Sequence, residues 1–120
     1  MRERQIAISA ANSKRMIEIT GRDGRVQRHP LLPNRTIIGR SENSTHISVQ
    51  DAKISRIHLQ ISLDQDGNAF VTDLYSANGS RLNRKKLQPQ KPTLWDVGDT
   101  VEIGRTKIAL YVDETPTLSR

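Results

Sequence analysis

The 120-residue sequence contains no cysteine. Disulfide bonds, thiolate nucleophiles and thiolate metal sites are therefore excluded, and the composition is compatible with a reducing compartment. Apolar runs are only a few residues long, and the first residues, MRERQ, are charged and lack the apolar core of a signal peptide. Because neither a membrane span nor a signal peptide is visible, we expect a soluble, cytoplasmic protein.

Aromatic residues make up only 3% of the chain, whereas the formal net charge is +6. The positive charge favours an anionic partner, which could be phosphate on a protein, nucleic acid or lipid, and it also improves solubility. The shortage of aromatic rings leaves few platforms on which the bases of a single strand could stack. Nucleic acid is therefore the less favoured of these partners.

Sustained helical periodicity is also missing, and short apolar stretches alternate with turn sequences instead. In residues 59–63, for example, Leu59, Ile61 and Leu63 fall on one face of a strand. The other candidate strands are 17–19, a stretch around Val26, RTIIG, HISV, 69–74, RLN, TVEI and 107–112. Some ten short strands favour an antiparallel β-sandwich or barrel over any helical fold.

One domain is expected, because 120 residues of which 34% are hydrophobic suffice for a single core. We predict a compact part at residues 15–112, a flexible N-terminal segment at 1–14 and a flexible C-terminal tail at 113–120. A further hypothesis is that phosphorylated Thr115 or Thr117 binds to the same or a neighbouring molecule, although most such tails are linkers.

Three predicted loops carry polar side chains suited to a doubly charged oxyanion. In IGRSEN, Gly39 allows a turn and Arg40 offers five donors in a planar fork that matches phosphate oxygens. The loops KISRIH and YSANGS add hydroxyl, guanidinium and amide groups. Loops at one end of a sandwich share a surface, so the candidate anion-binding residues are Arg40, Ser41, Ser55, Arg56, Ser76 and Asn78.

The order of short motifs along the chain resembles the forkhead-associated (FHA) domain family. The motifs are Gly39-Arg40, Ser55-x-x-His58, Asp73-Leu74, Asn78-Gly79-Ser80 with Asn83, Gly98-Asp99 and Ile103-Gly104. Each motif alone would occur by chance in many proteins. Together and in this order they are specific, and they span about residues 38–104.

The resemblance implies an antiparallel sandwich of about eleven strands whose loops at one end bind phosphothreonine in a partner protein. It implies that Arg40 and Ser55 hold the phosphate directly, that Ser41 and Arg56 assist, and that Ser76 and Asn78 bind the peptide main chain. It also implies that Gly39, His58 and Gly79 support the site structurally, with His58 bonding across loops so that Ser55 faces the ligand.

The basic segment RLNRKK, residues 81–86, admits two interpretations. It could be a solvated hairpin, which is the commoner case. It could instead read a residue downstream of the phosphothreonine, through Arg81, Asn83 or Arg84, with a preference for an acidic one.

Two positions depart from the usual pattern of the family. His46 lies between the first two loops, where acidic or small residues are common, and Ala77 lies where a hydroxyl is often found before Asn78. Ala77 removes one potential peptide contact. These departures bear on partner preference more than on phosphate binding.

Two other classes of binding protein remain open. One is a phosphate-independent interaction scaffold in which the same loops are structural. The other is a basic nucleic-acid-binding domain, although zinc-finger spacing, a recognition helix and RNA-binding aromatic motifs are all missing from the sequence. We expect a monomer, and we expect no membrane partner.

We expect no enzyme, metal or cofactor. Ser55 and His58 could suggest a hydrolase, but no orienting carboxylate or oxyanion-hole motif lies near them in the sequence. Residues three apart on an extended segment also point to opposite faces. His58 is therefore expected to be structural, and Gly98-Asp99 is expected to be only a turn.

Overall fold

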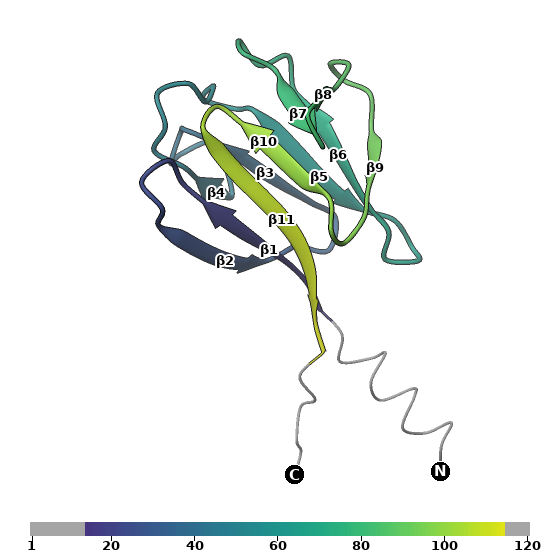
Figure 1. The fold of residues 1–120 in the computed structure, drawn as a ribbon. Coiled ribbons are helices and arrows are strands. Elements are labelled where there is room, and N and C mark those ends of the chain that lie inside the picture. The colour runs from purple at the N-terminus through teal and green to yellow at the C-terminus, as the bar shows by residue number, and fades with distance from the viewer. Residues whose placement is uncertain (1–13, 115–120) are drawn as a thin grey trace, which may run out of the picture.

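A computed structural model of the chain describes residues 14–114. The described residues form eleven strands in two sheets (Figure 1), which confirms the predicted all-β sandwich. All strand pairs are antiparallel except the short parallel pair of β3 and β4. The part of the chain from 14 to 114 has no helix long and apolar enough to cross a membrane.

Each sheet mixes strands from distant parts of the sequence. The first sheet, in the order β2-β1-β11-β10-β7-β8, consists of β1 (Lys14–Thr20), β2 (Val26–Pro30), β7 (Ser80–Leu82), β8 (Lys85–Lys86), β10 (Thr100–Ile103) and β11 (Thr106–Asp113). The second sheet, in the order β4-β3-β5-β6-β9, consists of β3 (Arg35–Gly39), β4 (Ile47–Ser48), β5 (Leu59–Leu63), β6 (Ala69–Asp73) and β9 (Thr93–Trp95).

The core lies between the sheets and follows from the alternation of side chains along each strand. Ile17 and Ile19 of β1 are buried, and Leu59 and Ile61 of β5 are buried on the other sheet. The full core set is Ile17, Ile19, Ile38, Ile47, Val49, Ile54, Leu59, Ile61, Ala69, Val71, Leu87, Trp95, Val101, Ile103, Ile108 and Leu110. Leu63, predicted to share the face of Leu59, is only partly buried.

Strand β9 was not predicted from the sequence. Its three residues are too few to show an alternating pattern, and it follows the proline-rich stretch QPQKP. Pairing with β6 defines it, because Trp95 lies opposite Ala69 in the register. Trp95 is buried, and its indole Nε1 donates to the carbonyl oxygen of Asp99 at 3.1 Å.

The basic turn predicted at residues 84–86 is shifted in the structure. The turn is formed by Asn83 and Arg84, which both have positive φ angles of 51° and 72°, as the tight hairpin turns that suit twisted strands require. Lys85 and Lys86 consequently belong to β8 rather than to the turn. In a sequence, asparagine followed by glycine usually marks this turn type. Here Arg84 follows the asparagine, so the sequence did not indicate the turn.

The described strands begin at Lys14 and end at Asp113, and these two residues are opposite each other in the pairing of β1 with β11. The predicted flexible segments at 1–14 and 113–120 otherwise lie outside the described residues, apart from Glu114, and stay predictions. Thr115 and Thr117 also lie outside them.

Replacing Ile38 by alanine should destabilise the fold by about 2–4 kcal/mol, because the fully buried side chain leaves a cavity between the sheets. Ile37→Ala on the same strand is the matched control: its side chain lies on the other face and is only half-buried, so we expect a loss of about 1 kcal/mol or less. Urea unfolding measures both values. Equal losses would contradict the assigned strand face.

Candidate functional site

The loop after β3 and the loop between β4 and β5 are joined by main-chain hydrogen bonds. Arg40 donates its N–H to the carbonyl oxygen of Ser55 at 3.0 Å, and Ser41 donates to that of Arg56 at 3.1 Å. Residues far apart in the sequence therefore have fixed relative positions. The site begins at this junction, because the Arg40 and Ser55 side chains leave adjacent main-chain segments.

The junction requires a glycine at the end of β3. A Cβ atom built on Gly39 would lie 2.2 Å from the carbonyl oxygen of Arg56 and 3.0 Å from the Cα of Ile57. Both are main-chain atoms, which cannot rotate away as the end of a side chain can. Gly39 therefore allows the two loops to approach closely enough to form their hydrogen bonds.

Arg40 is exposed, and one of its side-chain donors is used within the protein. Its Nε donates to the carbonyl oxygen of Ile54 at 3.0 Å. Its terminal nitrogens make no hydrogen bond or ion pair with any residue between 14 and 114. Arg40 is consequently held in place by one bond while four N–H groups stay available to a ligand.

Ser55 and Asn78 connect the second loop to the loop between β6 and β7. The Oγ of Ser55 accepts a hydrogen bond from the main-chain N–H of Ala77 at 2.9 Å, which leaves the serine hydroxyl hydrogen free to donate. The Nδ2 of Asn78 donates to the carbonyl oxygen of Lys53 at 2.9 Å, which leaves its Oδ1 as an acceptor. Arg40, Ser55 and Asn78 thus come from three loops that are bonded to one another.

The three remaining predicted binding residues differ in how far the protein already engages them. Ser41 is half-buried and Arg56 is exposed, and neither side chain forms a hydrogen bond with the described part of the chain. The hydroxyl of Ser76 donates to Oδ1 of Asp73 at 2.5 Å, so only its oxygen lone pairs are left for a ligand.

His58 lies beneath the site and is fully buried. Its Nδ1 accepts the N–H of Ser55 at 3.0 Å, and its Nε2 lies 2.9 Å from the carbonyl oxygen of Gly79. These bonds place the proton on Nε2 and tie the second loop to the third. Residues 55–58 are thus not extended, although the sequence argument against a hydrolase assumed that they are. The ring nevertheless bonds to the main-chain N–H of Ser55 and not to its Oγ.

The ring of His58 is neutral. Burial lowers its pKa, and the hydrogen bond to Gly79 and the carboxylates of Asp73 and Asp51, which raise it, do not compensate. The 3.9 Å separation between Nε2 of His58 and Oδ1 of Asp73 is therefore not an ion pair. The carboxylate of Asp73 instead holds the loop between β6 and β7, because it accepts hydrogen bonds from the Ser76 N–H and the Ser80 hydroxyl.

Sequence reasoning missed the role of Asp51, which lies on the second loop and is buried. Its carboxylate accepts the N–H groups of Lys53 and Arg105 and the hydroxyl of Thr106, at 2.9, 2.8 and 3.1 Å. Burial raises its pKa, but these hydrogen bonds and the nearby Arg22 outweigh burial, so the pKa is lowered. No motif marks this aspartate, because two of its three partners, Arg105 and Thr106, lie more than fifty residues away.

The basic hairpin of β7 and β8 directly follows the third loop of the site, which connects β6 to β7. Arg81 and Arg84 are exposed, but both ends of the Asn83 amide are engaged: Nδ2 donates to Asp99 and Oδ1 accepts the N–H of Thr100, both at 3.0 Å. Asp99 and the turn at Gly98 thereby anchor the hairpin. The bonds fix the orientation of the Asn83 amide and leave it one N–H and one oxygen lone pair.

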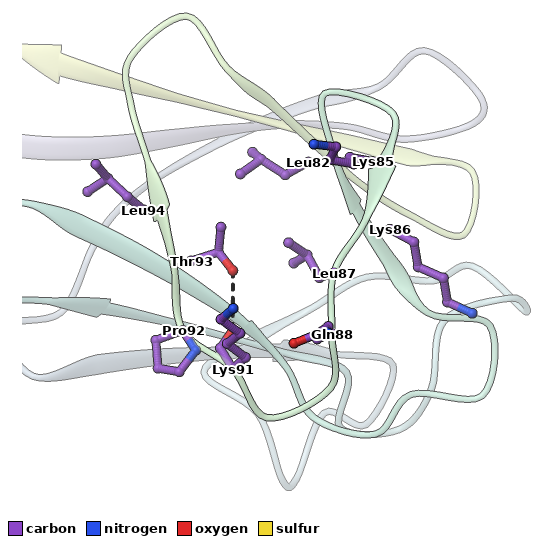
Figure 2. A pocket seen from close by; sticks show the side chains of 9 residues that line it. All are labelled: Leu82, Lys85, Lys86, Leu87, Gln88, Lys91, Pro92, Thr93 and Leu94. Atoms are coloured by element: carbon purple, nitrogen blue, oxygen red, sulfur yellow. Dashed lines mark hydrogen bonds between the residues drawn. The ribbon is translucent and has the colours of Figure 1, made fainter.

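Lys86 is the last residue of the basic segment, and the sequence interpretation gave it no role of its own. A Cβ atom on Gly79 would lie 2.9 Å from its Cε, so the lysine stem covers that glycine. Figure 2 shows Lys86 extending away from a groove between β8 and β9, along which Leu82, Leu87 and Leu94 lie. Lys86 therefore lies between this groove and the loop site.

The two positions that depart from the family pattern are structurally accommodated. His46 accepts the N–H of Ile37 on its Nδ1 at 2.8 Å and so fixes the first loop to β3. Ala77 uses its main-chain N–H to bind Ser55 and offers no side-chain donor.

The assembled site is a set of hydrogen-bond donors on fixed loops. Its groups with free hydrogen-bonding capacity are the Arg40 guanidinium, the hydroxyl of half-buried Ser55 and the Asn78 amide. The nearby carboxylates of Asp51 and Asp73 are buried and bonded to the protein. Among residues 14–114, no group of three His, Asp or Glu side chains could hold a metal ion. Such a site is suited to binding an anion.

Comparison with known proteins supports the family that the order of the motifs indicates. The sequence model of the FHA domain matches residues 36–104, more than half of the chain. An FHA domain-containing protein of Arabidopsis thaliana is 38% identical over 73 residues, which are 60% of this chain and 19% of that protein. The E3 ubiquitin-protein ligase rnf8 of Danio rerio is 34% identical over 70 residues, which are 56% of this chain and 14% of that protein. The chain therefore matches less than a fifth of the length of each relative.

Solved structures show the same fold. The FHA domain of a hypothetical protein of Arabidopsis thaliana is 30% identical with a TM-score of 0.71, over 89% of this chain and 91% of that one. An FHA domain from a structural and functional analysis of phosphothreonine-dependent FHA domain interactions is 27% identical with a TM-score of 0.69, over 81% and 94%. The expected FHA-type sandwich is therefore confirmed.

Replacing Gly39 by alanine should destabilise the domain by about 2–3 kcal/mol, because the new methyl group would collide with main-chain atoms of the second loop. Urea unfolding measures this loss. Gly21→Ala is the control, since a Cβ there would lie 3.2 Å from the end of the flexible Asp23 side chain, and we expect a change below about 1 kcal/mol. Equal effects of the two substitutions would contradict the proposed close approach.

Lowering the pH from 7.5 to 5.5 should destabilise the protein partly through His58. Its pKa is lowered in the folded state, so the unfolded chain binds the proton first as the pH falls below about 6.5. The stability that the neutral ring provides is complete above that pH and is lost toward the folded-state pKa, at up to about 1.4 kcal/mol per pH unit.

The measurement is urea unfolding at several pH values in the parent and in His58→Gln. The variant should be less stable at pH 7.5 and should show a smaller slope of stability against pH. Identical slopes would mean that His58 does not titrate between the folded and unfolded states.

Proposed function

This chain belongs to the FHA domain family, and from that membership we propose that it binds phosphothreonine in partner proteins as a signalling or assembly adaptor. The observation that carries the proposal is the convergence of Arg40, Ser55 and Asn78 on three mutually bonded loops, each with hydrogen-bonding capacity left over. A related FHA domain was solved in an analysis of phosphothreonine-dependent interactions.

The chemistry of the free groups matches a phosphate dianion. A phosphothreonine carries a charge of about −1.5 to −2 and three strong acceptor oxygens. Arg40 supplies charge and paired N–H donors, and Ser55 supplies a hydroxyl donor. One hydrogen bond to a charged group contributes about 1.5–3 kcal/mol, so two or three of them separate a phosphorylated peptide from a bare one by orders of magnitude.

The remaining residues would bind around the phosphate. Ser41 and Arg56 would add a hydroxyl and a second guanidinium. Asn78 would accept a peptide N–H on its free Oδ1, and Ser76 would act as an acceptor, because its hydroxyl hydrogen is donated to Asp73. Gly39, His58 and Gly79 would hold the loops in this arrangement.

Selection of residues downstream of the phosphothreonine would fall to Arg81 and Arg84, with a preference for acidic side chains. Both arginines are exposed, whereas the Asn83 amide is already bonded at both ends. Cytoplasmic localisation and a monomeric state remain predictions. The partner and the role of the whole protein are likewise proposals, because the chain matches only a small part of each of the two relatives named above.

Arg40→Ala should remove most binding to phosphothreonine peptides, a loss of about a hundredfold or more, and Ser55→Ala should weaken binding by about tenfold. An oriented phosphothreonine peptide library would first supply a peptide, with phosphoserine and unphosphorylated libraries screened in parallel. Isothermal titration of that peptide then measures the two variants.

Arg28→Ala is the matched control, since it removes the same charge from an exposed position on β2 where Arg28 pairs with Glu18. It should bind like the parent. Equal binding by Arg40→Ala would refute the assigned site. Capture of a partner that is unaffected by phosphatase would indicate a phosphate-independent scaffold, and DNA binding unaffected by Arg40→Ala would indicate a nucleic-acid-binding domain.

A further inference from the structure

Tyr75 has a backbone conformation that its side chain does not favour. Its φ angle is 55°, in the left-handed region that costs a bulky residue free energy and that glycine or asparagine adopts more easily. The other non-glycine residues with positive φ are Asn83 and Arg84, in the hairpin turn, and Gln90. Tyr75 is the aromatic member of this set among the described residues.

Hydrogen bonds on both sides of Tyr75 hold this conformation, whereas the residue itself is largely exposed. On one side of Tyr75 the N–H of Leu74 donates to the carbonyl oxygen of His58 at 2.9 Å, and on the other the N–H of Ser76 donates to Asp73 at 3.1 Å. The Tyr75 residue itself is 73% exposed, and its hydroxyl has no hydrogen bond to residues 14–114. Strain at a residue this exposed, whose hydroxyl has no partner among the described residues, points to a contact outside the domain.

A second exposed apolar residue lies on the adjacent loop. Strands β5 and β6 pair Leu59 with Asp73, and the bond between His58 and Leu74 continues the same register. The next residues on each side are Ile57 and Tyr75. Ile57 is 45% exposed, so each of the two loops joined by the His58–Leu74 hydrogen bond carries an exposed apolar residue next to that bond.

This apolar pair is contiguous with the candidate site. Ile57 directly follows Arg56, and Tyr75 directly precedes Ser76, so each is next in the chain to a predicted binding residue. A peptide bound at the phosphate site would lie on the same two loops that carry these residues. An exposed aromatic ring has few rotatable bonds and a large apolar surface, which suits it to a binding contact.

We propose that Tyr75, together with Ile57, forms an apolar contact for one aromatic or branched aliphatic side chain flanking the phosphothreonine of the partner. Tyr75 is then a specificity-determining residue of the same site, and this inference rests on the proposed phosphothreonine binding. The strained conformation persists because the contact favours an aromatic residue where asparagine or glycine would stabilise the free domain.

The test compares the parent with Tyr75→Asn and Tyr75→Phe in thermal unfolding and in the oriented phosphothreonine library. Tyr75→Asn should raise Tm by about 2–5 °C, because asparagine tolerates the left-handed conformation. The same variant should lose the enrichment for an apolar residue at one position and bind the peptide selected by the parent about tenfold more weakly. Tyr75→Phe should keep the enrichment, because it keeps the ring.

Gln90→Asn is the control for strain alone, since Gln90 also has a positive φ, of 66°, and is exposed on the connection between β8 and β9. It should raise Tm in the same direction and leave the library profile unchanged. Ile57→Ser should reduce the same enrichment that Tyr75→Asn abolishes.

Two negative outcomes are distinguishable. If the parent selects phosphothreonine peptides and Tyr75→Asn gives the same profile and affinity, the inference about Tyr75 is wrong and the proposed function stands. If the parent selects no phosphothreonine peptide at all, both fail. A profile that changes equally in Gln90→Asn would also overturn the inference, because the effect would then come from general stability.

Discussion

The buried imidazole of His58 is the contact on which the site geometry depends. One ring nitrogen accepts the main-chain N–H of Ser55, and the other donates to the carbonyl oxygen of Gly79, so a single side chain joins two of the three loops. Only a neutral ring can make both bonds, because protonated imidazole has no acceptor. Burial keeps the ring neutral, and the core thereby determines the hydrogen bonding of an exposed surface.

A second set of buried contacts holds the same loops from the other side. Gly39 lets β3 approach the main chain at Arg56, and Asp51 binds the turn between β10 and β11 to the loop that carries Ser55. The carboxylate of Asp73 likewise orders the loop of Asn78 through two serine hydroxyls. The groups left for a ligand are thus displayed on loops whose internal polar groups are already bonded, which reduces the entropy lost on binding.

Much of the fold could be predicted because strands with a buried face carry a two-residue period. Residues 59–63 and 100–103 were placed correctly from that pattern alone. Strand β9 was not predicted, because three residues are too few to show a two-residue period. Strand β8 was not predicted, because Arg84 occupies a turn position that glycine usually holds. Both strands are defined by their partners in the sheet, and a partner distant in the chain leaves no local signal.

The sequence by itself determined which polar groups are available and in what order they occur, since residue types and motif spacing are properties of the chain. Only the tertiary structure decided which of those groups are free. Ser76 and Asn83 look equivalent to Ser55 and Asn78 in the sequence, yet the Ser76 hydroxyl donates to Asp73. The Asn83 amide is bonded at both Nδ2 and Oδ1, whereas the Oδ1 of Asn78 accepts no hydrogen bond from the described residues. The physical reason is that hydrogen-bond partners are chosen by proximity in space, and most of these contacts join residues from different strands and loops.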